Sequence, residues 1–161
     1  MHFHFHRKKP SFLSTKEGGN NVQQTNKRVS IMCFHDELCQ VYNALMTALS
    51  LLRNGAEVTV FFGSRGVNAV HKDKVKDLKC LPDQPPEVGA RVMQLMDDMD
   101  LPLIEDLFVM LHMEGAKLLA CPLNIPLFSM TVNDLIEGVS IADPATYYTQ
   151  VVLPADMNLS F

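Results

Sequence analysis

Cys121 is the residue of this sequence best placed for thiol chemistry, because of the residues before and after it. Leu118–Cys121 is an apolar run that lies between Gly115 and Pro122, a pattern that predicts a short buried strand. Proline suits the first turn of a helix, where its missing N–H costs nothing. A thiol between a strand end and a helix start meets unpaired backbone N–H groups, which stabilise a thiolate. The alternative is a packing role, since free cysteine is among the residue types most often buried.

Two other residues are candidates for the same chemistry. Cys39 lies in the first turn of a predicted helix, 38–53, which follows the first predicted strand, so it shares the carboxyl edge of the sheet with Cys121. It is a possible second thiol for exchange reactions, which need an accessible thiolate. His35, in the loop before this helix, is a possible base or a cationic partner for the thiolate. The alternatives are a Cys39 side chain packed inward and a His35 side chain in solvent.

The remaining cysteines and the N-terminal histidines indicate no further site. Cys33 lies within a buried strand, and Cys80 lies in an irregular segment with no activating group nearby. Four scattered cysteines are too few for a disulfide framework in a chain of 161 residues, which favours a reducing cytoplasm. Histidines alternate with phenylalanines over residues 2–6, but no Cys, Asp or Glu lies near enough to complete a metal site. We therefore expect no metal and no cofactor.

Strand and helix patterns alternate along the chain and would position these residues. The predicted strands are 29–34, 57–62, 118–121, 139–141 and 157–161, and the predicted helices are 38–53, 67–71, 86–99, 101–113 and 144–152. Asp36 is the expected N-cap of the first long helix, and Asp143–Pro144 begins the last one. Segment 72–89 is predicted as a surface loop. This order predicts an α/β fold, a three-layer α/β/α sandwich around a mainly parallel five-stranded sheet.

The turn Gly63–Gly66 follows the second predicted strand and contains the small residues of a phosphate loop. It lacks the G-x-G-x-x-G spacing, and no Walker Gly-Lys-Ser/Thr follows it. We therefore expect these glycines to make a turn at a strand end. A flavodoxin-like nucleotide binder is kept as an alternative function.

Composition and charge place the chain among single-domain globular proteins. Hydrophobic residues make up 47% and charged residues 20%, and no apolar run is long enough to cross a membrane. Residues 1–28 carry a charge of +5 and the rest −9, which together give the net charge of −4. The acidic body argues against nucleic acid as a partner. We predict a flexible basic leader, 1–27, and one folded domain, 28–161.

Four segments, together with the last helix and strand, carry a resemblance to a known family; they are Leu51–Val58, Val60–Val67, Gly115–Cys121 and Leu135–Val139. Their order resembles that of the DsrE/DsrF/DsrH-like family of small sulfur-transfer proteins. The resemblance covers about residues 28–161, everything but the leader. This sequence departs from the family pattern at Ser64–Arg65, where close relatives often have bulky aromatic residues.

The resemblance implies an intracellular sulfur relay protein that carries sulfur as a cysteine persulfide on Cys121, with sulfurtransferase activity as a possibility. It implies TusA-like or rhodanese-like carrier proteins as partners, and a homo-trimer or hexamer. Methionine-rich helical segments also favour self-association; these methionines are Met93, Met96, Met99, Met110 and Met113. The alternative within the same fold is a non-catalytic binding or regulatory module in which Cys121 only packs. No nucleic acid or membrane partner is expected.

Overall fold

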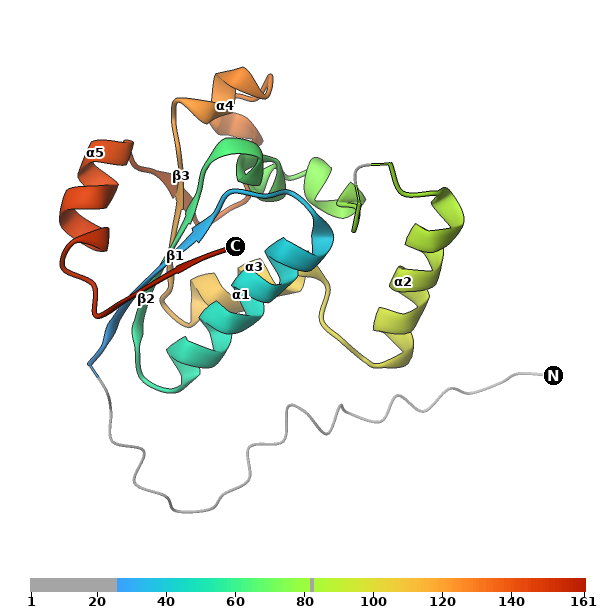
Figure 1. The fold of residues 1–161 in the computed structure, drawn as a ribbon, viewed down its shortest axis with the longest axis horizontal. Helices are drawn as coiled ribbons and strands as arrows, with labels where there is room; N and C mark the ends of the chain where they lie inside the picture. The colour runs from blue at the N-terminus through green and yellow to red at the C-terminus, as the bar shows by residue number, and fades with distance from the viewer. Residues whose placement is uncertain (1–25, 82) are drawn as a thin grey trace, which may run out of the picture.

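The computed structural model describes residues 26–81 and 83–161, which build a five-stranded sheet with helices on both faces (Figure 1). The strand order is β4-β3-β2-β1-β5, and every pairing between neighbours is parallel. The predicted α/β fold with five strands is confirmed. The predicted leader, 1–27, lies outside the described residues except for its last two, and so does the His/Phe alternation at 2–6. The strands are β1 (Arg28–Cys33), β2 (Glu57–Phe62), β3 (Lys117–Ala120), β4 (Val139–Ile141) and β5 (Met157–Ser160).

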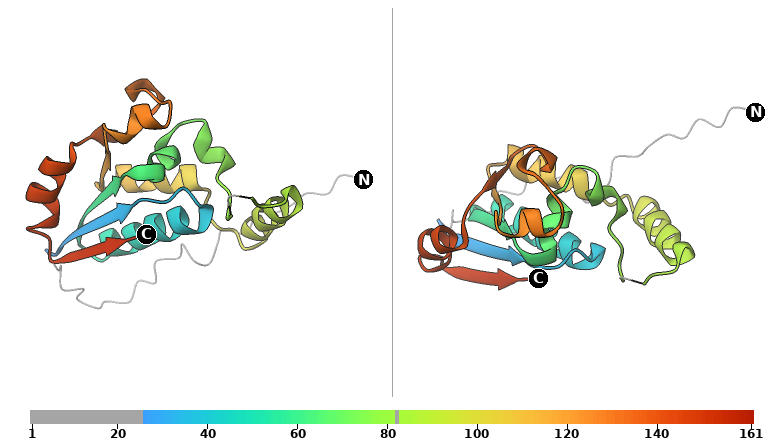
Figure 2. Two further views of the ribbon diagram at one scale, coloured as in Figure 1. Left: turned by 45° about the horizontal axis from the view of Figure 1, so that its top comes forward. Right: turned by 90° about the horizontal axis from the view of Figure 1, so that it is seen from above.

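Helices form the outer two layers (Figure 2). The helices α1 and α3 pack on one face of the sheet, and α5 covers the other face (Figure 1). Helix α2 lies at the periphery, and none of its residues is buried. The helices are α1 (Leu38–Arg53), α2 (Pro86–Asp98), α3 (Ile104–Met113), α4 (Asn124–Leu127) and α5 (Pro144–Tyr147), with 3-10 turns η2 (Ser64–Val70), η3 (Lys74–Asp77) and η4 (Val132–Asp134), and a π-helical turn η5 (Tyr148–Val152).

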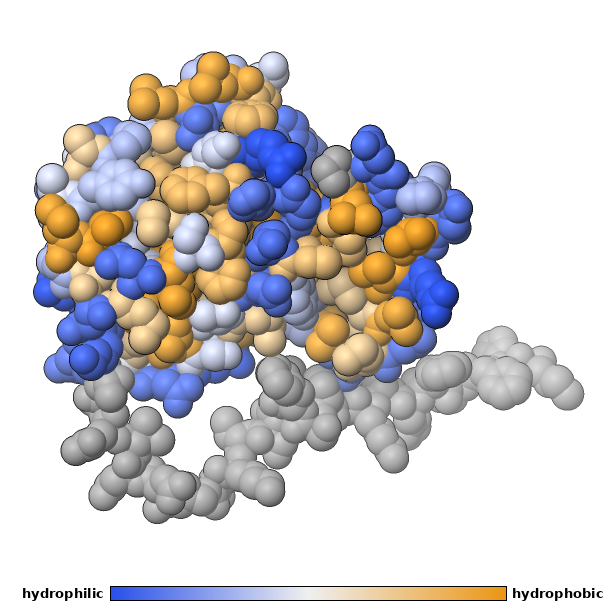
Figure 3. All heavy atoms as spheres, in the orientation of Figure 1, coloured by the Kyte–Doolittle hydropathy of each residue, from blue (hydrophilic) through white to orange (hydrophobic). Residues whose placement is uncertain are grey.

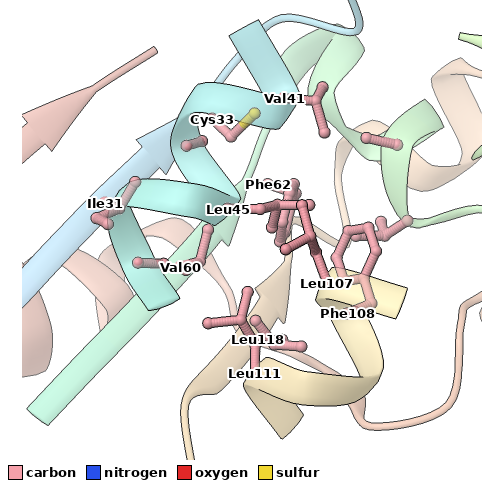
Figure 4. Packing of buried hydrophobic residues seen from close by; sticks show 14 of the residues in the cluster. Ile31, Cys33, Val41, Leu45, Val60, Phe62, Leu107, Phe108, Leu111 and Leu118 are labelled. Atoms are coloured by element: carbon pink, nitrogen blue, oxygen red, sulfur yellow. The ribbon is translucent and has the colours of Figure 1, made fainter. Parts of the chain in front are cut away.

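The main core lies between the sheet and the pair α1 and α3. Successive residues of a strand face opposite sides of a sheet, so Val60 and Phe62 of β2 point into this core while Phe61 points away from it. Leu45 of α1 and Leu107 of α3 meet these strand residues (Figure 4). The core fixes the rotation of β2 and of its neighbours, and therefore which residues each strand presents on the opposite face.

One predicted cap and two predicted helix starts differ from the structure. The short helix predicted at 67–71 is the 3-10 turn η2, which begins three residues earlier, at Ser64. The N-cap of α1 is Glu37 and not Asp36, because the Asp36 carboxylate accepts a hydrogen bond from Asn68 and faces Arg65 instead. Helix α3 begins at Ile104, three residues later than predicted, because Pro102 disfavours helical backbone at the residue before it. The Asp143 cap is confirmed, since its carboxylate accepts a hydrogen bond from the backbone N–H of Thr146.

The predicted loop 72–89 contains a 3-10 turn, η3, that its composition did not indicate. The helix predicted at 86–99 is confirmed, since α2 begins at Pro86, within the last four residues of that segment. Apolar side chains are exposed on α2 and around α4, and they form patches on the face shown in Figure 3. Among the described residues, no helix combines the length and the apolar character needed to cross a membrane.

Candidate thiol site at the carboxyl edge of the sheet

Cys121 follows the last residue of β3 directly, at the carboxyl edge of the sheet. Its backbone N–H donates to the carbonyl of Phe62 at 3.0 Å, which continues the pairing of β3 with β2 by one residue. Its carbonyl accepts from the N–H groups of Asn124 at 3.1 Å and Ile125 at 3.3 Å. The strand end at Cys121 is therefore as predicted, and hydrogen bonds from β2 and from the next turn of chain fix its backbone.

The helix expected to begin at Pro122 does not supply free N–H groups to the sulfur. Helix α4 begins at Asn124 and has only four residues. Its first N–H groups are used on the Cys121 carbonyl rather than on the thiol. Helix-dipole stabilisation of a Cys121 thiolate, the reason given by the sequence pattern, is therefore not part of this site.

The Cys121 side chain packs in a small aromatic cluster on the α5 face of the sheet. It is only 3% exposed, and the other two buried members of the cluster are Phe61 of β2 and Tyr147 of α5. The rings of Phe61 and Tyr147 are stacked, with centroids 4.1 Å apart and an interplanar angle of 11°. The half-buried residues around the cluster are Met32, Phe34, Leu119, Val151 and Val152. The thiol is thus enclosed by aromatic and aliphatic side chains.

Tyr147 anchors α5 to the sheet through its ring and its hydroxyl. The hydroxyl is hydrogen-bonded to the hydroxyl of Ser30 on β1, and neither residue is exposed to solvent by more than 1%. Burial outweighs the hydrogen bond to Ser30 and raises the pKa of Tyr147, so the hydroxyl stays protonated. The two residues are 117 positions apart in the chain, and this pair fixes the wall of the Cys121 cluster.

Two glycines allow the loops after β1 and β2 to pack closely beside this cluster. A Cβ atom on Gly63 would lie 2.8 Å from the ring of Phe34. A Cβ atom on Gly66 would lie 2.2 Å from the backbone carbonyl oxygen of Cys33, a contact that cannot form without moving the backbone. The glycines of Gly63–Gly66 therefore serve close packing in a turn at a strand end. A turn at this place is what the missing phosphate-loop spacing predicted.

A charged network lies at the same edge, on the loops after β1 and β2. Arg65 donates to Glu37 at 2.5 Å, and its Nε lies 3.5 Å from an Asp36 carboxylate oxygen. Nδ1 of His35 lies 3.3 Å from a Glu37 carboxylate oxygen. Burial of Glu37 opposes ionisation, but its own backbone N–H and the guanidinium of Arg65 lower the pKa of Glu37 below its usual range. The carboxylates of this network and Arg65 line a cavity of about 430 Å³ together with Lys74 and Lys79.

The other predicted site residues have contacts of their own. His35 is exposed and is engaged with Glu37 and Arg65. Cys39 is exposed on α1 and lines a cavity with Cys80, whereas Cys121 packs on the opposite, α5 face of the sheet. Cys33 is buried in the main core, where burial raises the pKa of its thiol to about 12, so it stays protonated and unreactive.

The site thus offers one enclosed thiol, an aromatic wall and a neighbouring charged network. Sequence patterns did not single out Tyr147, Phe34 or Arg65. Only Arg65 had a signal in the sequence, its departure from the aromatic residues expected at that turn. Within the described part of the chain, no group of three or more His, Cys, Asp and Glu side chains is placed to hold a metal ion.

Fold and site together define a small parallel α/β protein with a cysteine at the carboxyl edge of its sheet. A family model described as the DsrE/DsrF/DrsH-like family matches residues 25–160, and the chain belongs to this family. The match spans the whole body of the protein, and the segment Gly115–Cys121 lies within it. The family named by resemblance is therefore confirmed.

Solved structures show the same fold. The ychN protein from E. coli is 19% identical, with a TM-score of 0.60, and the match covers 84% of this chain and 99% of that one. MTH1491 from Methanobacterium thermoautotrophicum, described as a protein of unknown function, is 15% identical, with a TM-score of 0.60 and the same coverage of 84% and 99%. Identities this low show likeness of fold alone. No curated protein matches this sequence significantly.

Proposed function

We propose that this protein is a sulfur carrier, which holds sulfur as a persulfide on Cys121 and passes it to a partner protein. The observation that carries the proposal is the place of Cys121 in a member of this family: directly after β3, at the carboxyl edge of the sheet. Ligands of open parallel α/β sheets usually bind at this edge. Cys33 also lies at a strand end, but it is buried in the main core, whereas Cys121 packs in a separate aromatic cluster.

The proposed reaction is thiol exchange. The Cys121 thiolate attacks the outer sulfur of a donor persulfide, the donor S–S bond breaks, and the donor leaves as a thiolate that retains the bonding electron pair. Cys121 then carries one added sulfur as S–SH. Release is the same step with a partner thiolate as the attacking group and Cys121 as the leaving group. No external oxidant or reductant is consumed.

Burial of the thiol favours storage and requires opening for exchange. At 3% exposure, Cys121 is shielded from water and small oxidants by the surrounding side chains. Of the half-buried residues around Cys121, Phe34 is the one that lies on a loop, directly after β1. We infer that its ring moves aside when a donor or acceptor thiol reaches Cys121.

The exposed leucines after Cys121 support a protein partner. Leu123 is 65% exposed and Leu127 is 74% exposed, and both lie within six residues of the thiol, on the turn and helix that follow it. Large apolar side chains held in solvent beside a site are typical of docking surfaces. We propose that a TusA-like or rhodanese-like carrier docks on these leucines to reach Cys121.

A second apolar surface supports self-association as a trimer or hexamer. Exposed apolar side chains occur along α2 and on the outer side of α3. Helix α2 has no buried residue, and the buried residues of α3 are different from its exposed ones. Methionine-rich surfaces adapt well to partners, and soluble oligomers usually close by symmetry. The exposed apolar residues of this surface are Val88, Met93, Leu95, Met99, Leu103, Val109 and Met113.

Sulfur loading tests the proposal. The reduced protein is incubated with a small persulfide donor, alkylated and digested with trypsin, which places Cys121 alone in the C-terminal peptide 118–161. We expect that peptide to gain the mass of one sulfur atom, Cys121→Ser to abolish the gain, and Cys33→Ser, a control at another buried thiol, to retain it. If loading occurs on another cysteine or on none, the carrier role is wrong and a non-catalytic binding or regulatory module becomes the better interpretation.

Partner docking is tested with the same loaded protein. The double variant Leu123→Ser/Leu127→Ser is expected to load from the small donor as the wild type does, since neither side chain is buried. Transfer from this variant to a TusA-like carrier is expected to be slower. Equal transfer rates would show that the carrier docks elsewhere.

A further inference from the structure

Two cysteines far apart in the sequence lie together beside α1. Cys39 is in the first turn of α1, and Cys80 lies between η3 and α2. The backbone N–H of Leu38 donates to the carbonyl of Lys79 at 2.7 Å, so the residues directly before the two cysteines are held in contact. Both thiols line one cavity of about 200 Å³.

The walls of this cavity are mostly apolar, and one buried hydroxyl is available in them. Val92 and Met96 of α2 and Leu101 line the cavity together with residues of α1. Tyr42 of α1 also lines it, and its hydroxyl is buried with no hydrogen-bond partner among the described residues. Burial raises the pKa of Tyr42, so the hydroxyl remains a donor. A buried donor without a partner is costly, and a sulfur atom or a small ligand in the cavity would satisfy it.

The two thiols have different surroundings, which sets an order of reaction. Cys39 is exposed, whereas Cys80 is half-buried and packs against the main core. Burial first, and then its interaction with Cys39, raise the pKa of Cys80 to about 11. A reagent from solvent therefore meets Cys39 first, while Cys80 stays protonated beside it.

We propose that Cys39 and Cys80 are a redox-active dithiol that a low-molecular-weight disulfide converts into an intramolecular disulfide. The Cys39 thiolate attacks one sulfur of the small disulfide, and the first small thiol leaves with the electron pair of the broken S–S bond. Cys80 loses its proton and attacks the Cys39 sulfur of the mixed disulfide, and the second small thiol leaves. Two electrons pass from the two cysteines to the reagent, which is reduced to two thiols.

This modification site is separate from the Cys121 cluster and does not depend on sulfur carriage. The cross-link would tie the first turn of α1 to the segment that leads into α2. Because α2 contributes no buried residue, its position over the cavity rests on few contacts. Oxidation would therefore restrain the segment that leads into α2 and would leave the α5 face of the sheet unchanged.

Oxidation in a glutathione redox buffer tests the proposal. The full chain is reduced, equilibrated with oxidised glutathione, alkylated and digested with trypsin and a glutamate-specific protease. Cleavage after Glu37 separates Cys33 from Cys39, and cleavage after Lys79 isolates Cys80. We expect a Cys39–Cys80 cross-linked peptide that lacks two hydrogen atoms, with Cys33 and Cys121 still thiols.

Variants distinguish the dithiol from a single reactive cysteine. Cys80→Ser should accumulate a stable glutathione adduct on Cys39, because the attacking second thiol is gone. Cys39→Ser should leave Cys80 as a thiol, and Cys121→Ser should form the cross-link as the wild type does. A wild type that stops at a glutathione adduct on Cys39, or that links Cys39 to Cys121, would overturn the proposal. Loss of sulfur loading in a protein that still forms the cross-link would affect the carrier proposal alone.

Discussion

Removing the Tyr147 hydroxyl should destabilise the protein although it leaves the aromatic cluster filled. Tyr147→Phe retains the ring that stacks on Phe61 at 4.1 Å, so no cavity forms. The hydroxyl of Ser30, at 0% exposure, loses its partner. An unsatisfied buried hydroxyl costs about 1–3 kcal/mol, and we expect the free energy of unfolding to fall by that amount. Ser30→Ala should cost a similar amount, because it leaves the Tyr147 hydroxyl without its partner.

The double variant separates a buried hydrogen bond from loss of packing. Ser30→Ala/Tyr147→Phe removes both polar groups, and replacing both partners by apolar groups is nearly neutral, so it should lie within about 1 kcal/mol of the wild type. Urea unfolding, followed by circular dichroism, measures the free energy of unfolding of all three variants. The values can be compared if the slope of that free energy against urea concentration is the same in each. Tyr148→Phe, at a neighbouring tyrosine that is 45% exposed, is the matched control and should change stability by less than about 0.5 kcal/mol.

The result that would refute this reasoning is additivity. If the double variant loses as much stability as the two single variants together, the two hydroxyls are not coupled, and the hydrogen bond does not hold α5 to β1. The wall of the Cys121 cluster would then depend on ring stacking alone.

Three further predictions concern backbone packing, charge and assembly. Gly66→Ala should destabilise the protein by about 1–3 kcal/mol or more, as other overpacked cores do, because its Cβ would lie 2.2 Å from the Cys33 carbonyl oxygen; urea unfolding measures it. Arg53→Gln should cost up to about 1 kcal/mol at pH 7, because three hydrogen bonds join Arg53 to Glu114 at the surface between α1 and α3. Arg53 lowers the pKa of Glu114 in the folded protein. The stabilisation is therefore complete above the unfolded carboxyl pKa of about 4.3 and is lost as the pH falls through the lower folded pKa. A difference in stability between variant and wild type that persists below both pKa values would contradict this prediction. Light scattering should give a mass of three or six chains, and a monomer of 18.0 kDa would refute the assembly.

Local patterns were sufficient for most of the fold. The apolar runs of β1, β2 and β3, the stripe of α1 and the Asp143–Pro144 helix start depend on neighbouring residues, and the structure has each of them within one residue of the predicted place. The Asp36 cap was wrong because Asn68 and Arg65, about 30 positions away, bind that carboxylate instead. Sequence patterns contain no information on such competition.

The arrangement of the thiols could not be predicted from the sequence. Sequence order places Cys39 and Cys121 at the same carboxyl edge, but it does not show that they lie on opposite faces of the sheet. That separation depends on which face of the sheet α1 covers and on which face the residue after β3 presents its side chain. The proximity of Cys39 and Cys80 could not be predicted either, because it depends on a long-range backbone hydrogen bond between Leu38 and Lys79.

The most direct test of the sulfur-carrier proposal is to follow a heavy-isotope sulfur atom through Cys121. A persulfide donor labelled at its outer sulfur is given to the reduced protein, excess donor is removed, and a TusA-like carrier is added. We expect the label to appear first on Cys121 and then on the cysteine of the carrier, with loss from one matching gain by the other. Label that never appears on Cys121, or that reaches the carrier equally well from Cys121→Ser, would contradict the proposal.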